Sequence, residues 1–169
     1  MNREHAGVEA RFTGEAGTHT EIDIMKTFIA LVLTLAPMAA PAAEKFAATN
    51  TYVTESQTWP VDDTSGYWMV AFKGVSQVTE GPVETMAVQC NGAGFWGPDG
   101  LDGNGICVHG DGDDTFILRF DSQPGGNTWE ILSGAGKYEG LTGAGTAVTE
   151  ALPGNRRISR LTGEVSLGN

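Results

Sequence analysis

A glycine-rich stretch constrains the fold more than any other part of this chain. Residues 133–146 read Ser-Gly-Ala-Gly-Lys-Tyr-Glu-Gly-Leu-Thr-Gly-Ala-Gly-Thr, so five glycines surround one aromatic side chain. Glycine accepts positive φ and lets the backbone pass close to other segments, which suits a sharp corner between strands. The stretch predicts such a corner, with Tyr138 as a buried plug and with the structural glycines Gly134, Gly136, Gly140, Gly143 and Gly145.

The same stretch does not match a nucleotide-binding loop. A P-loop needs Ser or Thr after its Gly-Lys pair, but Tyr138 follows Lys137, and no glycine stands five places before Gly136. A dinucleotide-binding turn needs G-x-G-x-x-G at the start of a helix, and neither that spacing nor a helical apolar stripe is present. We therefore expect a structural role for the glycines and no cofactor.

Alternation of apolar and polar residues dominates the chain from residue 46 onward. Trp68, Val70 and Phe72 share one parity while Lys73 takes the other, as in a strand with one buried face. Eight such segments are predicted, at residues 46–58, 67–78, 86–90, 106–109, 115–121, 128–131, 146–152 and 156–167. Eight short antiparallel strands predict an all-β protein with a single closed barrel, and a β-sandwich is the alternative.

Cys90 and Cys107 are the only two cysteines of the chain. In an exported protein an isolated pair of this kind indicates one disulfide. Residues 91–105 between them are rich in glycine and predict an irregular excursion, which the disulfide would tie at its ends. His109 follows on a short strand, where we expect a partly exposed side chain.

The N-terminal part of the chain has the features of a targeting segment. Residues 25–43 combine a charged start, a short apolar run and small residues, which predicts a signal peptide. Residues 1–24 precede it and are interpreted either as the result of a misplaced start codon or as a disordered extension. The barrel domain is expected at 44–169, in a periplasmic or secreted protein without a membrane partner after signal cleavage.

The charge balance excludes one class of partner. Residues 43–169 hold seven Lys or Arg against sixteen Asp or Glu, a net charge of −9. Since such a chain repels phosphate backbones, nucleic acid is not expected as a partner. Three arginines near the last strand, Arg156, Arg157 and Arg160, predict either a solvated face with local ion pairs or a site for an anionic head group at a barrel mouth.

An acidic turn at residues 110–114 raises the question of a metal. Asp111, Asp113 and Asp114 are weak calcium candidates, but Phe116 stands where an EF-hand loop requires glycine and no glutamate closes that loop. Asp-Gly pairs also favour hairpin turns. We therefore predict a turn and no metal.

The motif from Trp129 to Thr146, together with Cys90 and the segments 105–108 and 111–113, resembles bacterial exported members of the allene oxide cyclase barrel-like group, relatives of dirigent proteins. The resemblance implies an eight-stranded calycin-like barrel with a central cavity and a homo-oligomer. The plant cyclase isomerises a fatty-acid-derived epoxide without a cofactor, and dirigent proteins steer radical coupling. None of their polar active-site residues is matched here, so no catalytic residue is assigned.

Large apolar side chains on separate strands are the candidate lining of such a cavity. They would equally serve as ordinary core, and we favour an interior that is filled or partly filled. The leading hypothesis is a non-enzymatic exported barrel that binds a small hydrophobic ligand. The alternatives are a cofactor-independent isomerase or cyclase and a structural or interaction barrel. The candidate cavity residues are Trp68, Phe72, Phe116, Phe120 and Trp129.

Overall fold

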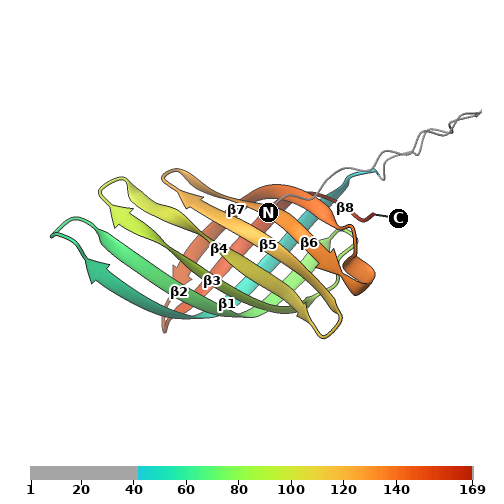
Figure 1. Cartoon of the computed structure of the whole chain (residues 1–169), viewed down its shortest axis with the longest axis horizontal. Helices are drawn as coiled ribbons and strands as arrows, with labels where there is room; N and C mark the ends of the chain where they lie inside the picture. The colour runs from blue at the N-terminus through green and yellow to red at the C-terminus, as the bar shows by residue number, and fades with distance from the viewer. Residues whose placement is uncertain (1–41, 169) are drawn as a thin grey trace, which may run out of the picture. The chain divides into compact units, whose positions relative to one another are not determined.

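Residues 42–168 are described by the computed structural model, and they form a closed antiparallel barrel (Figure 1). The predicted extension and nearly all of the predicted signal peptide lie outside the described residues. Each strand pairs with the next along the chain, and the last pairs with the first, so the barrel excludes the β-sandwich alternative and confirms eight strands. The elements are β1 (Glu44–Pro60), β2 (Gly66–Glu80), β3 (Met86–Gly97), β4 (Gly100–Asp111), β5 (Asp114–Gln123), β6 (Gly126–Ala135), the short 3-10 helix η1 (Gly136–Tyr138), β7 (Thr142–Leu152) and β8 (Arg156–Ser166).

Alternating side chains face the interior, as the parity of the sequence predicts. On β1 the residues Phe46, Ala48, Asn50, Tyr52 and Thr54 are buried while several of their neighbours are exposed. Because the strands alternate in direction, the β1–β2, β3–β4, β5–β6 and β7–β8 turns share one end of the barrel, which we call the open end. The other connections and η1 lie at the opposite, closed end (Figure 1).

The region between the two cysteines differs from the prediction. Residues 91–105 are not an irregular excursion, because they belong to the long paired strands β3 and β4, joined by a tight turn. Three of their glycines, Gly92, Gly103 and Gly105, leave room for aromatic rings. A Cβ atom at Gly92 would lie 2.5 Å from Phe120 Cζ, and one at Gly103 would lie 2.6 Å from Trp68 Cζ2. Glycine here serves ring packing inside a regular strand.

The predicted disulfide is confirmed. Cys90 and Cys107 are direct partners across β3 and β4, with Cα atoms 3.9 Å apart. The bond therefore crosslinks a hairpin instead of tying the ends of a loop. A disulfide of this kind fits an extracellular or periplasmic protein.

The glycine-rich stretch forms the corner between β6 and β7. Gly136 and Gly140 have φ of 61° and 75°, values that a residue with a Cβ atom rarely adopts. Tyr138 ends η1 with 2% of its surface exposed, and its hydroxyl accepts a hydrogen bond from the Glu84 backbone N–H at 3.3 Å. The corner thus places the Tyr138 ring in the core at the closed end.

The acidic turn between β4 and β5 is a hairpin. The Asp114 carboxylate accepts a hydrogen bond from the backbone N–H of Lys137 at 3.0 Å and lies 3.7 Å from its ammonium group. Across residues 42–168, no group of three or more His, Cys, Asp or Glu side chains converges as metal ligands would. The turn instead connects the hairpin to the glycine corner.

Candidate functional site: an open cavity in the barrel

A cavity of about 510 Å³ occupies the barrel toward its open end, and all eight strands contribute side chains to it. Thr58, Met69 and Leu101 line it and are themselves exposed, so the cavity reaches solvent. On β1, Asn50 is the lining residue farthest from the open end, while Phe46 and Ala48 before it belong to the packed core. The interior is therefore filled at the closed end and hollow at the open end.

Four of the five candidate aromatic residues line this cavity from β2, β5 and β6, and we call them together the aromatic wall. The indole N–H of Trp68 donates to the Phe95 carbonyl at 3.1 Å, and that of Trp129 donates to the Thr146 carbonyl at 3.0 Å. These bonds satisfy the polar atom of each indole, so the rings offer apolar surface to the cavity. The aromatic wall consists of Trp68, Phe72, Phe120 and Trp129.

Phe116, the fifth candidate, does not line the cavity. It is near the start of β5 at the closed end, where it stacks on His109 with ring centroids 4.5 Å apart and meets Tyr138 edge-on at 5.6 Å. Phe120 has the same parity four residues later and reaches the cavity. Alternation identifies the inward face of a strand but does not give the depth of a residue along the barrel.

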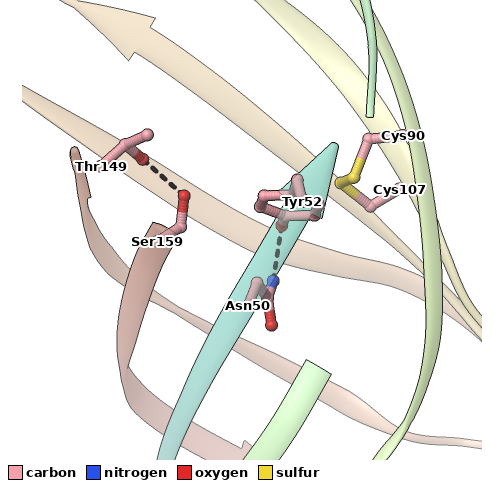
Figure 2. The surroundings of a disulfide bond; sticks show 6 residues. All are labelled: Asn50, Tyr52, Cys90, Cys107, Thr149 and Ser159. Atoms are coloured by element: carbon pink, nitrogen blue, oxygen red, sulfur yellow. Dashed lines mark hydrogen bonds between the residues drawn. A yellow bond between two sulfur atoms is a disulfide. The ribbon is translucent and has the colours of Figure 1, made fainter. Parts of the chain in front are cut away.

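The deep part of the cavity holds a polar pair that the sequence analysis missed, Asn50 and Tyr52 (Figure 2). The Asn50 Nδ2 group donates to the Tyr52 hydroxyl oxygen at 2.6 Å. Burial raises the pKa of Tyr52 to about 12, an effect that the hydrogen bond from Asn50 partly offsets. The hydroxyl thus stays neutral and free to donate its proton, while Asn50 Oδ1 has no hydrogen-bond partner within residues 42–168. Asn50 and Tyr52 have the same parity along the strand as Phe46, and this pattern could have identified them as inward-facing residues.

A second polar group spans β6, β7 and β8 on the cavity lining. The hydroxyls of Thr149 and Ser159 lie 2.7 Å apart (Figure 2), and Asn127 Nδ2 lies 3.4 Å from Thr149 Oγ1. Arg157 lines the cavity beside them and is the only charged residue among residues 42–168 that does so. The cavity is therefore amphipathic, with an aromatic wall and an uncharged polar group that adjoins a single cation.

The prediction for His109 was wrong, because its side chain is buried, with 1% of its surface exposed. On β4 it shares the inward parity with Cys107, whereas the apolar residues Ile106 and Val108 are exposed. Neither ring nitrogen has a hydrogen-bond partner in the described part of the chain. No hydroxyl or carboxylate there is thus placed to form a catalytic triad with it. Burial lowers the pKa of His109 to about 4.

Acidification from pH 7 to pH 5 is expected to lower the free energy of unfolding of both the wild-type protein and a His109→Leu variant. The decrease is expected to be about 2 kcal/mol larger for the wild-type protein than for the variant. The folded-state pKa of about 4 lies below the ordinary value of 6.5, so the unfolded chain takes up the proton first. The stability gained from neutral His109 is complete above pH 6.5 and declines as the pH falls toward 4. Urea unfolding of both proteins at the two pH values measures the difference, and parallel losses would contradict it.

The fold and the site together define an eight-stranded antiparallel barrel with an amphipathic cavity that opens at one end. No family model, no curated protein and no solved structure matches the chain. Within residues 42–168 there is no helix with the length and apolar character needed to cross a membrane.

Proposed function

We propose that this protein binds a small, largely apolar molecule inside its barrel, in a periplasmic or extracellular location. The observation that carries the proposal is the open cavity of about 510 Å³ with its aromatic wall. Cavities of about 300–1,000 Å³, mostly apolar and with a few placed polar groups, are typical of small-molecule sites. The Asn50–Tyr52 pair and the Thr149–Ser159 pair supply such groups here.

Binding without chemistry is favoured over the isomerase alternative, which the resemblance to allene oxide cyclases suggested. Proton abstraction needs a base, but across the described residues 42–168 no carboxylate or histidine lines the cavity. Tyr52 has a raised pKa and acts as a neutral donor, suited to holding a carbonyl or hydroxyl group. An isomerase that only polarises its substrate through Tyr52 is the second candidate, and it requires product formation that Tyr52→Phe abolishes.

A purely structural or interaction barrel is the third candidate. Its best support is a row of aromatic rings on the outer face near the open end, where Tyr67 lies 5.8 Å from Trp59 and 5.4 Å from Phe95 between ring centroids. A structural or interaction barrel does not need an open interior, but the interior of this barrel contains a cavity. Ligand binding accounts for the interior and is therefore preferred.

The neutral fluorescent probe N-phenyl-1-naphthylamine is expected to bind with one saturable site, and Ala147→Phe should weaken it at least about tenfold, equivalent to about 1.4 kcal/mol. Ala147 lines the cavity, so a larger side chain there occupies ligand space. Ala144 is exposed on the same strand, and Ala144→Phe is the matched control with unchanged affinity. Probe titration by fluorescence measures both. Absence of saturable binding, or equal affinity in both variants, would refute the proposal.

A further inference from the structure

We infer that the ligand of the cavity is an anionic amphiphile, with a single carboxylate or sulfonate group held by Arg157 at the open end. This inference rests on the proposed function and adds the charge and the orientation of the bound molecule. It depends on the position of Arg157, on the partners of the other arginines, and on the polar groups beside it.

Arg157 is the second residue of β8, just after the turn from β7. It shares the inward parity of Ser159 and Leu161, it is half-buried, and it lies across from Tyr52 of β1 in the strand register. In the part of the chain that the structure describes, no other charged side chain lines the cavity. A positively charged guanidinium group at this place favours ligands with a negative charge.

The other arginines in residues 42–168 have partners. Arg156 Nε donates to the Pro153 carbonyl at 2.9 Å, Arg160 pairs with Glu150 at 2.6 Å, and Arg119 pairs with Asp121 and Glu130. For the Arg157 guanidinium, the described part of the chain provides no hydrogen bond and no ion pair. Arg157 is thus available to a ligand, although acidic residues outnumber basic ones more than twofold in residues 43–169.

The chemistry of the guanidinium group favours an oxyanion. Its planar array of N–H donors matches the two oxygen atoms of a carboxylate, and the same donors suit a sulfonate. Partial burial strengthens the attraction, because the charges are less screened than in bulk water. Since the net charge of −9 repels anions from the rest of the surface, selective anion binding requires a local site such as this one.

The surroundings of Arg157 orient an amphiphile. Ser159, Thr149 and Asn127 extend the polar surface away from Arg157 on β8, β7 and β6, and the aromatic wall supplies the apolar contacts of the same cavity. A ligand with an anionic group at Arg157 would therefore place its apolar body against the rings.

A matched pair of probes tests the charge directly. The anion 1-anilinonaphthalene-8-sulfonate carries the same aromatic body as neutral N-phenyl-1-naphthylamine plus one sulfonate group. In Arg157→Gln, the dissociation constant of the anion is expected to rise about tenfold, while that of the neutral probe stays within about twofold. Arg157→Lys keeps the charge and should restore most of the affinity for the anion. Arg160→Gln, which removes an exposed arginine with its own partner, should change neither constant.

The outcomes separate this inference from the proposed function. Neutral-probe binding with an anion affinity that Arg157→Gln leaves unchanged would overturn the inference and keep the binding proposal. An equal loss of anion affinity in Arg160→Gln would indicate a general surface-charge effect and also overturn it. If neither probe shows saturable binding to the wild-type protein, the binding proposal fails and the inference fails with it. Circular dichroism and thermal melting confirm that each variant is folded.

Discussion

Replacing Tyr138 with alanine is expected to lower the free energy of unfolding by about 4 kcal/mol. The ring is 2% exposed and packs edge-on against Phe116 at the closed end of the barrel. Its removal leaves a void in the core at the closed end, where Tyr138 packs among other buried side chains. Urea unfolding monitored by circular dichroism measures the loss.

Two variants show whether the Tyr138 ring itself is responsible. Tyr138→Phe keeps the ring and loses only the hydrogen bond from the Glu84 N–H, so a loss of about 1 kcal/mol is expected. Tyr67→Ala removes a half-exposed tyrosine from the outer face and should cost clearly less than Tyr138→Ala. The plug would be disproved by a Tyr138→Ala protein that unfolds at the same urea concentration as Tyr138→Phe.

The prediction of Tyr138 as a buried plug shows which features of the fold can be predicted from the sequence. Glycines on both sides of one aromatic residue leave few arrangements other than a corner with that ring inside, and the strand alternation from Phe46 onward requires inward and outward faces. Both are local signals. They were sufficient for the strand number, the position of the β6–β7 corner and the buried parity of most strands.

The errors arose where a local signal had two meanings. Glycines normally interrupt strands, so Gly92 and Gly103 suggested an irregular loop, although in the barrel they make room for Phe120 and Trp68. That requirement comes from a ring on another strand and is not visible in the glycine segment itself. His109 was misplaced because the expectation of a partly exposed side chain did not use its shared parity with Cys107, which is buried.

The candidate site was predictable in its wall but not in its polar groups. Four of the aromatic residues of inward parity line the cavity. Asn50 and Tyr52 share the inward parity of Phe46, and Arg157 was one of three arginines considered for an anionic head group, but their place in one cavity depends on the register between β1 and β8. Among three neighbouring arginines, parity separates Arg157 from Arg156 and Arg160 only once the inward face of β8 is known. The depth of each residue depends on how the strands are staggered when the barrel closes, which no single segment specifies.

Removal of the crosslink tests the hairpin that was mistaken for a loop. A Cys90→Ala, Cys107→Ala double variant is expected to lose about 3 kcal/mol of unfolding free energy and roughly 10 °C in melting temperature, because the bond restricts the unfolded chain over a separation of 17 residues. Both cysteines also line the cavity, so the space left by each sulfur atom joins existing free volume and adds little packing loss. Reduction of the wild-type protein should therefore reproduce most of the decrease, while the same reductant leaves the double variant unchanged. A wild-type melting temperature that is insensitive to verified reduction would show that the paired strands β3 and β4 hold the hairpin without the crosslink.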